Sequence, residues 1–177
     1  MELYRAGLFA VTVGDITKLA VDAIVNSTNP GFTRGIGVDA AIHEAAGPEF
    51  ARANAALGTA VFGEARITPG FLLPAKHVIH VVAPIWRDGH QGEAALLAKT
   101  YRAALKAAYF NGVKTIALPA ISTGTYAFPL EEATRIALET ARDFVRERPG
   151  RLERIIFCPF TAADGAVYTR LASAILA

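Results

Sequence analysis

Short runs of apolar residues recur along the chain, and these runs are rich in Val and Ile. Such runs are typical of strands that are buried on both faces of a sheet. The pattern predicts strands at residues 8–13, 23–25, 64–67, 78–83, 115–118 and 154–158. Apolar residues at helical spacing lie between most of them. This spacing predicts helices at residues 38–46, 48–57, 92–110, 130–147 and 163–176.

Strands that alternate with helices of this length favour crossover connections and a largely parallel sheet. Only a short polar turn separates the first predicted strand from Asp22, so we expect that strand to join antiparallel at an edge. The predicted fold class is α/β: a three-layer α/β/α sandwich with a mixed, largely parallel central sheet of about six strands. Ligands of such sheets bind beyond the carboxyl ends of the strands.

The composition favours one domain and narrows the class of partner. Of the 177 residues, 53% are hydrophobic and 19% are charged, so the chain can bury a sizeable core and we expect residues 1–177 to form a single domain. A formal net charge of +2 is too small to favour general nucleic-acid binding. The chain has no run of about 18 apolar residues, so we expect no membrane span. One cysteine, Cys158, cannot form a disulfide within the chain, and we expect a cytoplasmic protein.

Residues 14–43 carry the densest cluster of candidate functional residues. They include Gly14-Asp15-Ile16-Thr17, then a strand followed by Asn26-Ser27-Thr28-Asn29, then a loop with Gly31, Gly35 and Gly37 before Val38-Asp39. Glycines let backbone N–H groups approach phosphate, and a helix N-terminus supplies partial positive charge. Asparagine amides offer donors and acceptors that suit sugar hydroxyls. The segment therefore predicts a site for a phosphorylated sugar.

A second candidate phosphate loop follows the predicted strand at residues 115–118. It reads Ser122-Thr123-Gly124-Thr125-Tyr126. Consecutive N–H groups around a glycine form an anion-binding nest. Because this loop and the loop at residues 26–37 each follow a strand, we expect both at the same edge of the sheet. The alternative is an ordinary strand-to-helix loop, which the flanking prolines also suit.

These motifs resemble those of the macrodomain family, the ADP-ribose-binding modules. The likeness covers nearly the whole chain in the family's order, through residues 14–43, 68–84 and 117–129. It implies that Asp15 accepts from the adenine amine, that Ile16 contributes its backbone N–H, and that Phe160 stacks on adenine. From the residues alone, Asp15 can instead cap a turn with Thr17, and Phe160 can be a core phenylalanine.

Asn29 and Asp39 lie ten positions apart, a spacing that resembles hydrolytic macrodomains of the MacroD type. The resemblance implies that Asn29 orients the distal ribose and that Asp39 positions or activates a water beside the same sugar. His43 lies four residues after Asp39, on the same helix face, where it can steer the Asp39 carboxylate. The alternatives are that Asp39 complements the helix dipole and that His43 is simply packed.

The resemblance assigns the other ligand contacts to the two loops, with Tyr126 against the distal ribose. They are Asn26, Gly35, Ile36, Gly37 and Val38 in the first loop, and Ser122, Thr123, Gly124, Thr125 and Tyr126 in the second. The first loop departs from the family, because Arg34-Gly35-Ile36-Gly37 stands where hydrolytic relatives often carry four glycines. A positive φ at Ile36 would be costly. Because Gly35 and Gly37 remain, the departure bears on turnover more than on binding.

Three functions follow from these features. The first is hydrolysis of ADP-ribosyl esters, with O-acetyl-ADP-ribose or ADP-ribosylated Asp and Glu side chains as substrates and with no cofactor or metal. The second is an ADP-ribose-binding module without turnover. The third, a nicotinamide-dependent oxidoreductase, needs a cleaner glycine-rich turn than residues 31–37 provide. His77 and His80 do not predict a metal site, because a separation of three puts them on opposite faces of a strand. The expected partner is the ADP-ribosyl substrate, and no signal for an oligomeric state is present.

Overall fold

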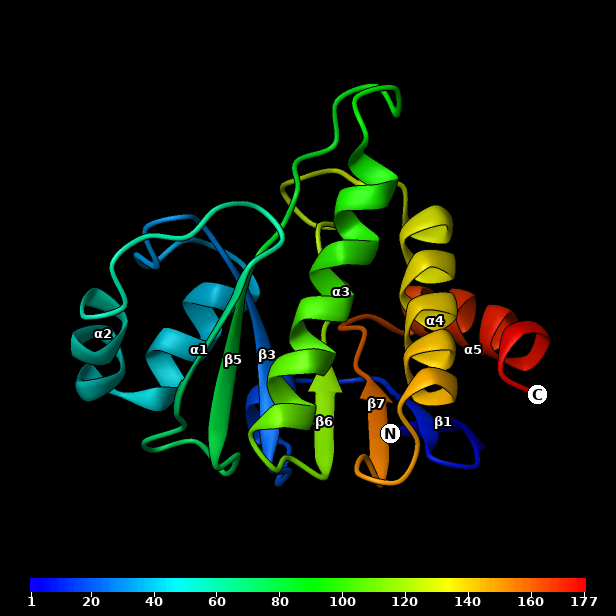
Figure 1. The fold of residues 1–177 in the computed structure, drawn as a ribbon, viewed down its shortest axis with the longest axis horizontal. Helices are drawn as coiled ribbons and strands as arrows, with labels where there is room; N and C mark the ends of the chain where they lie inside the picture. Colours follow the sequence, from blue (N-terminus) through cyan, green and yellow to red (C-terminus); the bar gives the residue numbers. More distant parts are fainter.

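The computed structural model describes residues 1–177, and its centre is one sheet of seven strands in the order β1-β2-β7-β6-β3-β5-β4 (Figure 1). The strands are β1 (Glu2–Ala6), β2 (Phe9–Thr12), β3 (Ala23–Thr28), β4 (Ala65–Pro69), β5 (His77–Val82), β6 (Thr115–Leu118) and β7 (Arg154–Phe157). The five inner strands are parallel to one another. The two edge strands, β1 and β4, are antiparallel to their neighbours.

Five α-helices cover both faces of this sheet. On one face, α1 (Val38–Ala46) and α2 (Pro48–Ala55) contact β3 and β4. On the other face, α3 (Glu93–Phe110) packs against α4 (Leu130–Glu147), and α5 (Ala162–Ile175) packs against α4, β1 and β2. The predicted three-layer sandwich is confirmed, and the predicted helices match to within two residues at each end.

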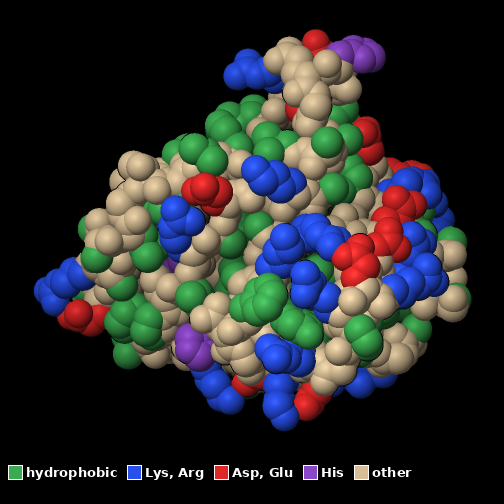
Figure 2. Space-filling view, viewed as in Figure 1, with side chains coloured by type: hydrophobic (Ala, Val, Ile, Leu, Met, Phe, Trp, Pro, Cys, Tyr) green, Lys and Arg blue, Asp and Glu red, His purple; other side chains and the backbone are tan.

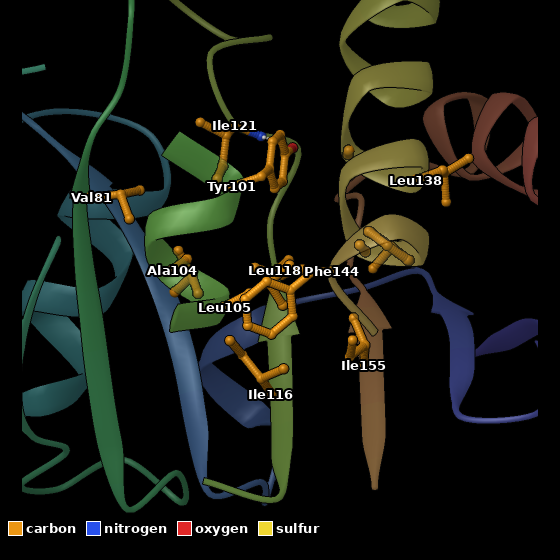
Figure 3. Packing of buried hydrophobic residues seen from close by; sticks show 14 of the residues in the cluster. Val81, Tyr101, Ala104, Leu105, Ile116, Leu118, Ile121, Leu138, Phe144 and Ile155 are labelled. Carbon is orange, nitrogen blue, oxygen red and sulfur yellow. Dashed lines mark hydrogen bonds between the residues drawn. The ribbon is translucent and has the colours of Figure 1, made fainter. Parts of the chain in front are cut away.

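Alternate residues of each inner strand enter two different hydrophobic clusters, because successive side chains of a strand point to opposite faces. In β3, Val25 belongs to the cluster under α3 and α4, whereas Ile24 belongs to the cluster under α1 and α2. Figure 3 shows the first cluster, where α3 and α4 meet β6 and β7. There the Tyr101 hydroxyl donates to Pro119 O at 3.3 Å and accepts from the Ile121 N–H at 3.1 Å. Tyr101 thereby holds the segment that follows β6.

One edge of the sheet differs from the prediction. The first predicted strand, β2, pairs parallel with β7 and does not lie at an edge. The edge is β1, which the apolar pattern missed and which pairs antiparallel with β2. Its Glu2 and Arg5 are exposed, and charges are common on edge strands because one side faces water. No continuous apolar run marks such a strand, so the sheet has seven strands rather than six.

The segments that follow β2, β7, β6 and β3 all leave the sheet at the edge formed by the carboxyl ends of the strands, because these four strands are parallel neighbours. Ligands of α/β sheets bind at this edge. The segment between β5 and α3 projects beyond it (Figure 1), with charged and histidine side chains at its tip (Figure 2). None of the helices has the length and apolar character that a membrane crossing requires.

Candidate functional site

A cleft of about 240 Å³ lies at this edge, between the segment that follows β3 and the segment that follows β6. Its lining comes from both segments: Ser27, Thr28, Asn29, Gly35, Ile36, Gly37, Val38, Asp39, Ser122, Gly124, Thr125 and Tyr126. The two predicted phosphate loops therefore share one cleft. The physical reason is the strand order, because β3 and β6 are direct neighbours in the sheet.

Asp39 lies in the first turn of α1 and is almost completely buried at the wall of the cleft. Its Oδ2 accepts from the Gly35 N–H at 2.5 Å, and its Oδ1 accepts from Asn26 Nδ2 at 2.6 Å. A Cβ at position 35 would lie 3.2 Å from Asp39 Oδ2, which is tighter than an ordinary contact. Gly35 therefore allows the loop to close onto the carboxylate.

The backbone of the first loop does not need glycine at position 36. In this loop the glycine with positive φ is Gly37, at 62°, and neither Gly35 nor Ile36 has one. The Ile36 side chain is 66% exposed. The cost expected for Ile36 therefore does not arise. The backbone N–H groups of Ile36, Gly37 and Val38 donate to no group of the chain, so they are available to an anion in the cleft.

The two asparagines that follow the β3 apolar run have different surroundings. Asn26 is fully buried and does not line the cleft, because its amide faces Asp39 and the β5 residue His80. Its predicted direct contact with a ligand is therefore not supported by this geometry. Asn29 does line the cleft. Its Oδ1 accepts from the N–H groups of Gly31 and Thr33, and its Nδ2 donates to Thr33 O at 2.8 Å, so Asn29 also shapes its own loop.

The second loop turns sharply around Gly124. Ser122 has a φ of 65°, and its Oγ donates to Pro84 O at 2.7 Å. The Ala127 N–H donates to Gly124 O at 2.9 Å, and Ala127 has a φ of 57°. The backbone N–H groups of Gly124, Thr125 and Tyr126 donate to no group of the chain. Thr123 makes no wall of the cleft, and its hydroxyl donates to Ala120 O. The loop thus has three consecutive free N–H groups around a glycine, which is what an anion-binding nest needs.

The ends of β2 and β7 bring Asp15 and Phe160 close together. The Gly14 N–H donates to Pro159 O at 3.1 Å, so the residues that follow each of them are neighbours. Phe160 is 75% exposed, which excludes the alternative of a core phenylalanine. An exposed aromatic ring and a carboxylate that follow neighbouring strands suit a purine, because bases stack on aromatic side chains.

Asp15 can both cap a turn and accept a hydrogen bond from a ligand, because its two carboxylate oxygens have different surroundings. Asp15 Oδ1 accepts from the Thr17 N–H at 2.9 Å and from the Thr17 hydroxyl at 2.6 Å, so Asp15 caps the turn. Its Oδ2 has no partner in the chain, and the residue is exposed. The Ile16 side chain is buried, while its backbone N–H donates to no group. One oxygen and one N–H therefore remain available to a ligand.

His43 lies beside Asp39 but belongs to a different cavity. Its Nε2 is 3.8 Å from Asp39 Oδ1 and 3.4 Å from Asn54 Nδ2. Burial lowers the pKa of His43 below 6.5, the Asp39 charge opposes this, and the Arg34 charge adds to it. A neutral His43 is therefore favoured. His43 and Arg34 line a separate cavity of about 530 Å³, so Arg34 does not face the cleft between the loops.

A family model described as Macro domain matches residues 25–137. The chain belongs to the macrodomain family. A macro domain-containing protein of Ralstonia nicotianae is 55% identical over 154 residues, which are 87% of this chain and 88% of that protein. An O-acetyl-ADP-ribose deacetylase of Escherichia fergusonii is 47% identical over 165 residues, covering 91% of this chain and 93% of that protein. A solved variant of the Oceanobacillus iheyensis macrodomain with ADPR matches with a TM-score of 0.91 at 34% identity, covering 99% of this chain and 98% of that one.

This macrodomain has further residues at the cleft that sequence reasoning did not assign. Ser27 and Thr28 line it, and Thr28 Oγ1 is buried without a partner. Their position at the carboxyl end of β3 was the available signal. Trp86 supports the second loop, because its backbone N–H donates to Tyr126 O at 2.9 Å. Nothing in the sequence around Trp86 indicates this contact, which joins residues forty positions apart.

Proposed function

We propose that the protein binds ADP-ribose in the cleft between the two loops and hydrolyses ADP-ribosyl esters. The substrates are O-acetyl-ADP-ribose and mono-ADP-ribosylated Asp or Glu side chains. One observation carries the proposal: two loops with unpartnered backbone N–H groups share a cleft with the buried carboxylate of Asp39. The N–H groups suit a diphosphate, and the carboxylate suits activation of water. The relative named O-acetyl-ADP-ribose deacetylase supports the same reaction class.

The order of the strands supports a direction for the ligand along the sheet. Asp15 and Phe160 follow β2 and β7, the second loop follows β6, and Asp39 follows β3. Adenine then lies at the β2–β7 end, with Phe160 against its face and Asp15 Oδ2 accepting from its amine. The diphosphate lies between the two nests of N–H groups. The distal ribose reaches the β3 end, between Asn29 and Tyr126.

The chemistry that we propose is hydrolysis by a positioned water. Asp39 accepts one hydrogen bond at each oxygen, and each carboxylate oxygen has a second lone pair that can hold a water against the ester. The water oxygen bonds to the ester carbonyl carbon while its proton passes to Asp39. The bond between that carbon and the ribose oxygen then breaks, and the ribose oxygen takes the proton back from Asp39. The products are ADP-ribose and a carboxylic acid. A general base of this kind contributes about 10²- to 10⁴-fold in rate.

A binding module without turnover is the second candidate. The observation that favours it is that the Asn29 amide is hydrogen-bonded at both of its polar atoms within its own loop, which leaves it less able to orient a sugar. The glycines of the first loop do not follow a strand directly and do not form the turn that a dinucleotide oxidoreductase requires, so we do not propose that activity.

One experiment separates these candidates. The protein is mixed with ADP-ribose in a calorimeter and with O-acetyl-ADP-ribose in a product assay. We expect heat of binding with the first and release of acetate and ADP-ribose from the second. Binding without product would leave the binding module, and the absence of both would overturn the whole assignment. The assay is run with a chelator present, because no cluster of His, Cys, Asp and Glu that could hold a metal exists in the chain.

Three further expectations remain proposals. We propose that residues 1–177 act as one macrodomain, because helices from both halves of the chain pack on the one sheet. We also propose that the protein does not bind nucleic acid generally, since its formal net charge is only +2. A cytoplasmic location agrees with the buried free thiol of Cys158, because such compartments keep thiols reduced.

A further inference from the structure

A chain of buried polar side chains continues from Asp39 into the sheet. Asn26 on β3 and His80 on β5 are register partners, so their side chains share a face of the sheet. Asn26 Nδ2 is 2.6 Å from Asp39 Oδ1 and 3.4 Å from His80 Nδ1. His80 Nε2 is 2.9 Å from the hydroxyl of Thr68 on β4. Each of these residues is at least 95% buried, so water does not compete for these bonds.

The direction of each hydrogen bond follows from the groups involved. The Asn26 amide nitrogen can only donate and the Asp39 carboxylate can only accept, so His80 Nδ1 must be the acceptor of the second amide hydrogen. Burial, together with the nearby His43, lowers the pKa of His80 to about 3, and the ring is neutral at physiological pH. Its single proton is therefore on Nε2 and is donated to Thr68 Oγ1.

The His80 ring has little freedom to leave this position. Phe50 of α2 lies over it with ring centroids 5.3 Å apart, and Phe32 meets it edge-on with centroids 6.0 Å apart. Both phenylalanines are fully buried. The aromatic contacts hold the plane of the imidazole, so its Nδ1 lone pair stays aimed at the Asn26 amide.

We propose that His80 is a positioning residue that acts through Asn26 to fix the carboxylate of Asp39. The proposal rests on the proposed hydrolysis. An amide can turn over about its last bond, and the reversed orientation of Asn26 would place Oδ1 against the Asp39 carboxylate and the His80 lone pair. Asn26 Oδ1 is buried without any partner, so it does not select an orientation. The two acceptors, the Asp39 carboxylate and His80 Nδ1, select the orientation of the Asn26 amide. His80 Nδ1 remains an acceptor even when Asp39 takes up a proton during the reaction.

The test compares two substitutions of nearly equal shape, His80→Asn and His80→Leu. Asparagine keeps an acceptor oxygen near the position of Nδ1, whereas leucine has none. We expect His80→Leu to lower kcat by about ten- to a hundredfold, which is the effect of losing one buried hydrogen bond, with KM within about twofold. We expect the His80→Asn protein to keep most of the activity that the His80→Leu protein loses. His77→Asn, at the start of the same strand, is the control and leaves kcat unchanged.

Equal kcat values for the His80→Asn and His80→Leu proteins, whether high or low, would overturn the proposal, because a purely packing role does not distinguish them. A second measurement uses the native protein alone, so it depends neither on turnover nor on the folding of a variant. Long-range ¹H–¹⁵N spectra of the native protein, which has four histidines, report the protonated ring nitrogen of His80. A proton on Nε2 supports the proposal and a proton on Nδ1 overturns it. If native protein shows the Nε2 proton but no hydrolysis, the proposed function fails while the positioning of Asp39 stands.

Discussion

The backbone N–H of Gly35 donates to Asp39 Oδ2 at 2.5 Å, and this bond joins the glycine loop to the first turn of α1. The same carboxylate receives Asn26 on its other oxygen. Asp39 therefore organises the loop that borders the cleft while it also faces that cleft. Its position depends on the loop, and the shape of the loop depends on it, so changes at either residue should affect both binding and turnover.

Replacing Asp39 by Ala should lower kcat for O-acetyl-ADP-ribose by about 10²- to 10⁴-fold, which is the range for loss of a general base. The variant should remain folded, because the sheet does not depend on this side chain. Product release is measured by chromatography and folding by circular dichroism. Turnover that is unchanged in a folded variant would remove Asp39 from the mechanism.

Replacing Gly35 by Ala should lower kcat/KM by about tenfold, because a displaced catalytic group reacts much more slowly. The new Cβ would lie 3.2 Å from Asp39 Oδ2 and would push the carboxylate. Gly31→Ala is the matched control in the same loop, because its Cβ would make only an ordinary contact of 3.6 Å with Asn29 Oδ1. Equal activities for these two alanine variants would show that the Gly35 contact has no effect on Asp39.

Replacing Phe160 by Ala should weaken ADP-ribose binding by about 1–3 kcal/mol, the usual value of stacking on an aromatic side chain. The free energy of unfolding should hardly change, because Phe160 is 75% exposed. Calorimetry gives the affinity. Phe110→Ala removes another exposed phenylalanine, at the end of α3, and should leave binding unaltered. A similar loss of affinity in both variants would argue against stacking on Phe160.

Replacing Ala127 by Gly should raise the free energy of unfolding by about 0.5–1 kcal/mol, because alanine at φ 57° is strained and glycine is not. For a protein of this size the expected rise in Tm is roughly 1–4 °C, measured by calorimetry. Ala56→Gly is the opposite case, since Ala56 has a φ of −75° and should lose stability. A lower Tm for the Ala127→Gly protein would contradict the strain argument.

Stability should fall when the pH is lowered below about 6.5. In the folded state burial holds the pKa of His80 at about 3, against 6.5 for an ordinary histidine. Between these values the unfolded chain binds a proton that the folded chain does not, so the unfolding free energy falls by about 1.4 kcal/mol for each pH unit. The lowered pKa of His43 acts in the same direction. Denaturant titrations at pH 7, 6 and 5 measure this slope, which should be shallower in the His80→Asn protein.

Much of this structure could be predicted from the sequence. The sequence predicts the helix at residues 38–46 with its observed bounds, because the acid Asp39 stands in its first turn and Gly47-Pro48 ends it. That both loops lie at the same end of the sheet was predictable, because each follows a strand of a largely parallel sheet. That they share one cleft depends on β3 and β6 being neighbours, which only the structure shows. The edge strand β1 was not, because Glu2 and Arg5 interrupt its apolar pattern. The different surroundings of Asn26 and Asn29 were not predictable either. Asn26 lies within β3 and its side chain faces α1, whereas Asn29 follows the end of β3 and its side chain bonds to its own loop.

The sequence by itself determined the five helices and six of the seven strands, the family, and the two loops whose N–H groups suit phosphate. These follow from local properties, namely apolar periodicity, glycine and the ends of elements. The tertiary structure decided which groups became partners: the Asp39 carboxylate with the Gly35 N–H and the Asn26 amide, the Gly14 N–H with Pro159 O next to Asp15 and Phe160, and the Trp86 backbone N–H with Tyr126 O. Those contacts join residues that are far apart in the chain or turned by packing. Side-chain direction and burial depend on the assembled sheet, and no local pattern specifies them.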